Sequence, residues 1–97
     1  MIDNPYQKDI RESFLLDVSC GQCKEEFAVY QKVGRGNVLR MYVPRIIKCA
    51  VDLSSLPQKL HCPNCNQHIA DRIELKEKSE VAYRMERSSF NTKEIHR

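Results

Sequence analysis

The chain has 97 residues, of which 30% are charged and 7% are aromatic, and it contains no tryptophan. This length fits a single domain with a modest core, which a metal ion or disulfides would help to stabilise. The net charge of +3 is too small to indicate a nucleic-acid partner by itself. No apolar run approaches the roughly 18–20 residues that a membrane helix needs, so no membrane segment is expected.

Polar side chains dominate residues 1–12, and Pro5 interrupts them, so we expect a flexible N-terminal arm. This segment lacks the basic stretch followed by an apolar stretch that defines a signal peptide. The five cysteines are an odd number, which a disulfide framework would leave incomplete. Together these features predict a reducing, cytoplasmic setting in which disulfides do not persist.

Two strands are expected to flank the motif Cys20-Gly21-Gln22-Cys23. Apolar side chains alternate in residues 13–18 before the motif, and residues 27–33 after it show the same period of two. This period is typical of strands, in which successive side chains point to opposite faces. We therefore expect a hairpin that carries the first cysteine pair at its tip.

The middle of the chain also alternates. Residues 34–37, with two glycines, predict a turn, because glycine adopts positive φ without steric cost. Residues 38–43 and 47–53 read as half-buried strands, and Pro44 places a bend between them. If the strand at 38–43 pairs with the strand at 27–33 as a hairpin, side chains of the two strands can share one surface.

A short segment leads into the second motif, Cys62-Pro63-Asn64-Cys65. Beyond it, residues 69–87 are rich in helix formers, but their apolar side chains keep to odd positions. A helical stripe cannot hold one parity over so long a stretch. We predict two strands, at 69–77 and 80–87, joined by a turn near Lys78-Ser79, with one long helix as the alternative.

The expected fold is mainly β, with small antiparallel sheets joined by a four-cysteine zinc site at two hairpin tips. The zinc-binding domain spans residues 13–90, and residues 91–97 form a C-terminal tail. A Cys-x-x-Cys turn aims two thiolates at one ion, and two such turns complete the tetrahedron that zinc prefers. The predicted ligands of one structural Zn²⁺ are Cys20, Cys23, Cys62 and Cys65.

Two other chemistries fit the cysteine pairs less well. The first motif resembles the active site of thioredoxins, but that motif requires a helix after it, and strand-like alternation follows Cys23 here. Iron also accepts four thiolates, so it is the alternative metal. After each motif the backbone turns left-handed in typical sites, which suits Asn66 better than Lys24.

The remaining thiol and the histidines are expected to lie outside the metal site. Cys49 falls among alternating apolar positions, as a small buried residue does. A sensor thiol at that position would require exposure. His61 and His68 flank the second motif and His96 lies in the tail, but four cysteines already fill the site.

Basic and aromatic residues interleave around the middle strands. The candidate nucleic-acid contacts are Lys32, Arg35, Arg40, Tyr30 and Tyr42. Their cations would hold phosphates and their tyrosines would stack on bases. The alternative is a sheet face on which these side chains only maintain solubility.

The layout of the two motifs resembles the zinc-bound β-tent superfamily, and it is similar to a zinc ribbon. The superfamily includes methionine sulfoxide reductase B, Yippee-type proteins, the ligand domain of cereblon and RNA-sensing domains of innate immune helicases. The resemblance implies a zinc clamped between β-sheets by the two motifs. It does not extend to activity, because Cys49 lacks the reductase signature and the absence of tryptophan removes an aromatic cage.

These observations predict a structural-zinc domain that is not an enzyme and that acts as an interaction module. Its partner is expected to be a protein or a nucleic acid, with no membrane and no small-molecule substrate. Weak RNA or DNA binding through the face of Arg40 and Tyr42 is the first alternative function. A thiol redox or sulfoxide reductase-like enzyme is the second.

Overall fold

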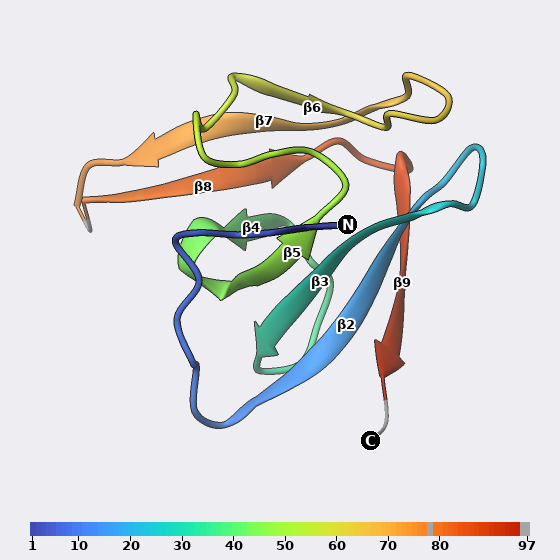
Figure 1. Ribbon diagram of the computed structural model, residues 1–97. Helices are drawn as coiled ribbons and strands as arrows, with labels where there is room; N and C mark the ends of the chain where they lie inside the picture. The colour runs from blue at the N-terminus through green and yellow to red at the C-terminus, as the bar shows by residue number, and fades with distance from the viewer. Residues whose placement is uncertain (78, 96–97) are drawn as a thin grey trace.

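Two antiparallel sheets make up the protein in the computed structural model, which describes residues 1–77 and 79–95 (Figure 1). In spatial order, the first sheet contains β1 (Ile2–Asp3), β5 (Ile46–Cys49), β3 (Glu26–Val33), β2 (Ser13–Cys20) and β9 (Phe90–Ile95). The second contains β4 (Arg40–Tyr42), β8 (Glu80–Met85), β7 (His68–Leu75) and β6 (Lys59–His61). The predicted fold class, mainly β with small antiparallel sheets, is confirmed.

The segment after the second motif forms two strands, as predicted, and the helix alternative is wrong. β7 and β8 pair from Ala70↔Met85 to Leu75↔Glu80. The odd-numbered apolar positions of β8 include Tyr83 and Met85, which are both buried. Lys78, in the predicted turn, lies outside the described residues.

Each cysteine motif lies at the tip of a hairpin, as expected. β2 pairs with β3 around the first motif, and β6 pairs with β7 around the second. The register shifts between Val18 and Ser19 in the first hairpin and between Leu60 and His61 in the second. Both irregularities immediately precede the first cysteine of the motif, where a bulge redirects the side chains that follow. The two tips lie side by side at one end of the molecule (Figure 1).

Residues 27–33 and 38–43 do not pair with each other as a hairpin. β3 pairs with β2 and β5 in the first sheet, whereas β4 pairs with β8 in the second. The glycine-containing segment 34–37 therefore carries the chain from one sheet to the other. After β4, the 3₁₀ turn η1 (Val43–Arg45) contains Pro44 at the predicted bend and returns the chain to β5.

The N-terminal segment, expected as a flexible arm, packs against the domain. β1 pairs with β5, and the buried side chain of Asn4 donates hydrogen bonds to the carbonyl oxygens of Val43 and Ile46, both at 2.8 Å. The side-chain oxygen of buried Gln31 accepts a hydrogen bond from the backbone N–H of Ile10 at 3.0 Å. Buried amide groups must find partners, so these two side chains hold the segment in place.

The C-terminal segment also differs from the expected tail. Residues 90–95 form β9, which pairs with β2 from Cys20↔Phe90 to Leu15↔Ile95. β9 is held by backbone hydrogen bonds to the open edge of β2. Such pairing requires no apolar side-chain pattern, so the sequence did not indicate this strand. Residues 96–97, which include His96, lie outside the described residues.

The core lies where the two sheets face each other. Its largest fully buried apolar side chains come from both sheets and from the segments between them: Tyr30, Tyr83, Phe27, Met41, Ile46, Leu53, Leu60, Ile69 and Val18. No helix in the described part of the chain is long and apolar enough to cross a bilayer.

Candidate metal centre

The two cysteine loops share one backbone design. In the first, Cys20 donates its N–H to the carbonyl of Glu25 at 2.9 Å, and its carbonyl accepts the N–H of Lys24 at 3.0 Å. In the second, the matching bonds run from Cys62 to Gln67 at 2.9 Å and from Asn66 to Cys62 at 2.7 Å. We call residues 20–25 the first knuckle and residues 62–67 the second knuckle.

The residue after each pair adopts the left-handed conformation that such a turn requires. Lys24 has φ of 68° and Asn66 has φ of 66°. This conformation was expected to suit Asn66 better than Lys24. The side chain of Lys24 compensates locally, because its Nζ donates to the carbonyl of Gly21 at 2.8 Å.

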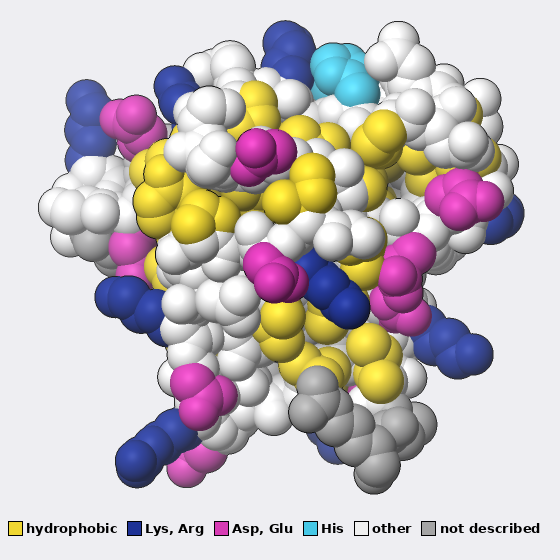
Figure 2. All heavy atoms as spheres, in the orientation of Figure 1, with side chains coloured by type: hydrophobic (Ala, Val, Ile, Leu, Met, Phe, Trp, Pro, Cys, Tyr) yellow, Lys and Arg dark blue, Asp and Glu magenta, His cyan; other side chains and the backbone are white. Residues whose placement is uncertain are grey.

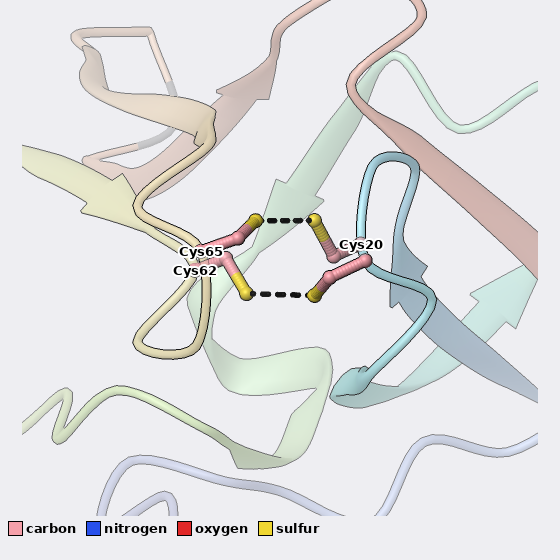
Figure 3. A group of neighbouring side chains, drawn as sticks. Cys20, Cys62 and Cys65 are labelled. Atoms are coloured by element: carbon pink, nitrogen blue, oxygen red, sulfur yellow. Dashed lines mark hydrogen bonds between the residues drawn. The ribbon is translucent and has the colours of Figure 1, made fainter.

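The four cysteine sulfurs of the knuckles converge on one point (Figure 3). The Sγ atoms of Cys20 and Cys65 lie 3.5 Å apart, and those of Cys23 and Cys62 lie 3.6 Å apart. All four sulfurs fall within 4.8 Å of one another. Each close pair joins one knuckle to the other, so the cluster connects the first sheet to the second.

This spacing fits a shared metal ion better than disulfides. A disulfide holds its sulfurs at about 2.05 Å, far less than the distances found here. A tetrahedral Zn²⁺ with Zn–S bonds near 2.3 Å separates its sulfurs by about 3.8 Å. The donor set therefore fits one tetrahedral ion, and its four cysteines are the ones that the sequence motifs singled out.

The electrostatics of the cluster also favour a cation. The side chain of Asn64 and the backbone N–H of Glu25 lower the pKa of Cys23 to about 6. The backbone N–H of Gln67 stabilises the Cys65 thiolate, but burial and the three neighbouring sulfurs still raise its pKa to about 12. Four thiolates so close together repel one another, and a divalent ion removes this repulsion.

The sequence did not indicate two groups that support the knuckles. Asn64 belongs to the second knuckle, yet its side chain hydrogen-bonds to Cys23 of the first. Ser89, which is buried, accepts the N–H of Gly21 on its carbonyl at 2.8 Å. Both contacts join segments that are distant in sequence, so no local pattern could reveal them.

Gly21 leaves no room for a side chain. A Cβ atom there would lie 2.9 Å from the carbonyl carbon of Ser89, closer than real contacts allow. We expect Gly21→Ala to destabilise the domain by about 1–3 kcal/mol, as overpacking does, and to weaken metal retention. Chemical denaturation and metal transfer to a chelator measure the two effects. Gln22→Ala, an exposed site in the same loop, is the control, and equal behaviour of the two variants would contradict the prediction.

Cys49, His61 and His68 lie outside the sulfur cluster, as expected. Cys49 is buried, and its desolvation raises the pKa of its thiol to about 11. His68 Nε2 lies 2.9 Å from Asp71 Oδ1, and His68 Nδ1 lies 3.9 Å from Glu86 Oε2. These three residues form a second compact group of potential ligands. Each ring nitrogen of His68 therefore faces a carboxylate, and none of the four cysteines belongs to this group.

The five predicted nucleic-acid contacts do not all lie on one exposed surface. Tyr30 is only 1% exposed, so it cannot stack on a base. The register pairs it with Leu16 across β2 and β3, which places it on the core face. Its hydroxyl instead accepts the backbone N–H of Tyr42 at 3.0 Å. Lys32, Arg40 and Tyr42 line one surface groove together with Tyr30, whereas Arg35 is not part of that lining.

Comparison with family models, with curated proteins and with solved structures gave no match for this chain. The fold and the site therefore define the class of protein by themselves. It is a mainly β domain in which a four-cysteine cluster, able to hold a metal ion, joins two antiparallel sheets.

Proposed function

We propose that this chain is a structural-zinc β domain that works as an interaction module rather than as an enzyme, in a reducing compartment such as the cytoplasm. The observation that carries the proposal is the convergence of four sulfurs from two hairpin tips. One ion bound there would fasten the two sheets together. The proposal places this chain near the zinc ribbons and β-tent domains that its motifs resemble.

The donor set supports a structural role for the ion. Catalytic zinc sites keep one coordination position open for water or substrate, whereas structural sites use four protein ligands. Four cysteines supply the complete set here, and Cys20 and Cys62 are buried. A thioredoxin-like function has less support, because the first motif leads into the strand β3 rather than into a helix.

Zinc is the proposed metal because a tetrahedron of thiolates is its usual structural site. Iron binds the same ligands, so the test must identify the element and count it. We expect protein purified without added metal to contain one zinc per chain by elemental analysis. The iron form would show visible thiolate-to-iron absorption, which zinc lacks. Less than half an equivalent of zinc, with all four thiols alkylated in the folded protein, would contradict the proposal.

A further inference from the structure

A groove of about 980 Å³ lies where β3, β4 and the end of β8 meet, on the side of Tyr42 and Arg45. Five basic side chains from four separate segments line it: Lys32, Arg40, Arg45, Arg84 and Arg87. No aspartate or glutamate among the described residues belongs to its lining. On the face drawn in Figure 2, by contrast, basic and acidic side chains are intermixed.

The cations of the groove lack anionic partners within the described part of the chain. In that part of the chain, Lys59 pairs with Asp71, and His68 contacts Asp71 and Glu86; none of these contacts includes a groove residue. Arg40 and Arg84 even face each other directly across β4 and β8. Arg84 also lies opposite Asp71 of β7, but no ion pair among the described residues joins the two. Like charges directly opposite each other are destabilising, and a bound polyanion would reduce the repulsion between Arg40 and Arg84.

The same groove exposes apolar surface. Leu39 is 73% exposed and Val33 is 39% exposed, although both are large apolar side chains. Phe90 and Tyr42 contribute two partly exposed aromatic rings to the lining. A ligand that fits this surface combines several negative charges with flat or apolar groups.

Arg45 and Tyr42 form a stacked pair within the groove. The guanidinium carbon of Arg45 lies over the Tyr42 ring, 4.6 Å from its centroid. A planar guanidinium on an aromatic ring presents a flat platform of the kind on which nucleobases stack. Carboxylate side chains of an acidic peptide would use the charge of Arg45 but not this platform.

We propose that this groove binds single-stranded nucleic acid, with phosphates on the five cations and bases against Tyr42, Phe90 and Leu39. This inference rests on the proposed interaction role and names its partner. A duplex fits less well, because its stacked bases are hidden and leave the apolar lining without a contact. At one end Arg40 also borders a smaller hollow, in which acidic Glu74 and Glu77 are mixed with basic Lys76.

The test uses the full, metal-loaded chain and fluorescent oligonucleotides of about ten residues, within the usual length of such sites. Oligo(U) and oligo(dT) distinguish RNA from DNA, and a polyglutamate chain of equal length serves as the acidic-peptide probe. We expect both oligonucleotides to bind. If all five cations contact phosphates, affinity falls roughly a hundredfold between about 50 and 200 mM salt.

Two groove variants and one charge-reversal control outside the groove assign the surface. The double variant Arg40→Glu/Arg84→Glu should abolish binding, and Tyr42→Ala should weaken it roughly tenfold or more through the loss of stacking. Lys59→Glu reverses a charge on β6, at the opposite edge of the second sheet from β4, and should retain binding. Metal content and the melting curve of each variant show that loss of binding does not follow from loss of the zinc or of the fold.

The outcomes are distinct. No binding at the lower salt, or binding that survives the double variant, overturns the nucleic-acid site while the zinc proposal stands on its own metal analysis. Polyglutamate that binds as tightly as the oligonucleotides also overturns it, in favour of an acidic protein segment. Loss of binding in the groove variants alone, with the oligonucleotides preferred to polyglutamate, supports it.

Discussion

Replacement of Cys62 by serine is expected to leave the domain largely unfolded at about 25 °C, because structural metal binding is coupled to folding. Cys62 is buried, and its substitution removes one of the four sulfurs of the cluster that joins the sheets. Structural zinc supplies about 10–16 kcal/mol of apparent binding energy in zinc-finger peptides, whereas whole domains are stable by only about 5–15 kcal/mol. Circular dichroism and thermal melting measure the fold, and a chelator should unfold the unsubstituted protein in the same way.

Cys49→Ala is the matched control for this experiment. It also removes a buried thiol, but Cys49 lies outside the cluster, between Ile2 of β1 and Ala28 of β3 in the first sheet. We expect it to keep one equivalent of metal and to lose about 1 kcal/mol of stability, as a small core vacancy does. If Cys62→Ser stays folded with its metal while Cys49→Ala loses it, the ligand assignment is wrong.

Tyr83→Ala is expected to produce the largest loss of stability at a position outside the sulfur cluster. Tyr83 is fully buried in the core between the sheets, so its truncation should cost about 3–5 kcal/mol. Its hydroxyl donates to the carbonyl of Pro57 at 2.8 Å, which fixes the segment that leads to β6. Chemical denaturation measures the loss in free energy of unfolding, and the slope m should be the same for the variant and the unsubstituted protein.

Two companion variants separate the contributions of Tyr83. Tyr83→Phe keeps the ring and should cost only about 1 kcal/mol, the typical value of one hydrogen bond. Leu39→Ala shortens a side chain that is 73% exposed and should change stability by less than about 0.5 kcal/mol. Similar losses for Leu39→Ala and Tyr83→Ala would show that the core does not lie between the sheets.

The sequence predicted the parts of the fold that depend on local pattern. Alternation on either side of each motif indicated the two hairpins, and the odd parity of apolar residues indicated β7 and β8. The spacing within each Cys-x-x-Cys motif indicated the knuckles. These features arise within a few residues, where strand geometry and turn chemistry decide the structure.

The sequence could not predict which strand pairs with which. The alternation of β4 is compatible with either sheet, and only the whole fold places it beside β8. Tyr30 shows the same limit, because the register with β2 turns it into the core although its neighbours in sequence suggested a polar face. The sequence also did not indicate that the two terminal segments pack against the domain. The buried side-chain amides of Asn4 and Gln31 hold the N-terminal segment, and β9 is held by backbone pairing with β2.

The four outer strands of the two sheets have a consequence for self-association. An exposed strand edge offers unpaired backbone groups to another chain, and proteins limit this with short or charged edges. Here β1 has two residues, β4 and β6 have three each, and β9 carries Lys93 and Glu94. Pro44 directly follows the start of η1 and prevents an extension of β4 as a regular strand. We therefore expect that the domain does not self-associate through its strand edges at high concentration. We also expect partners to bind its side chains rather than to add a strand to a sheet.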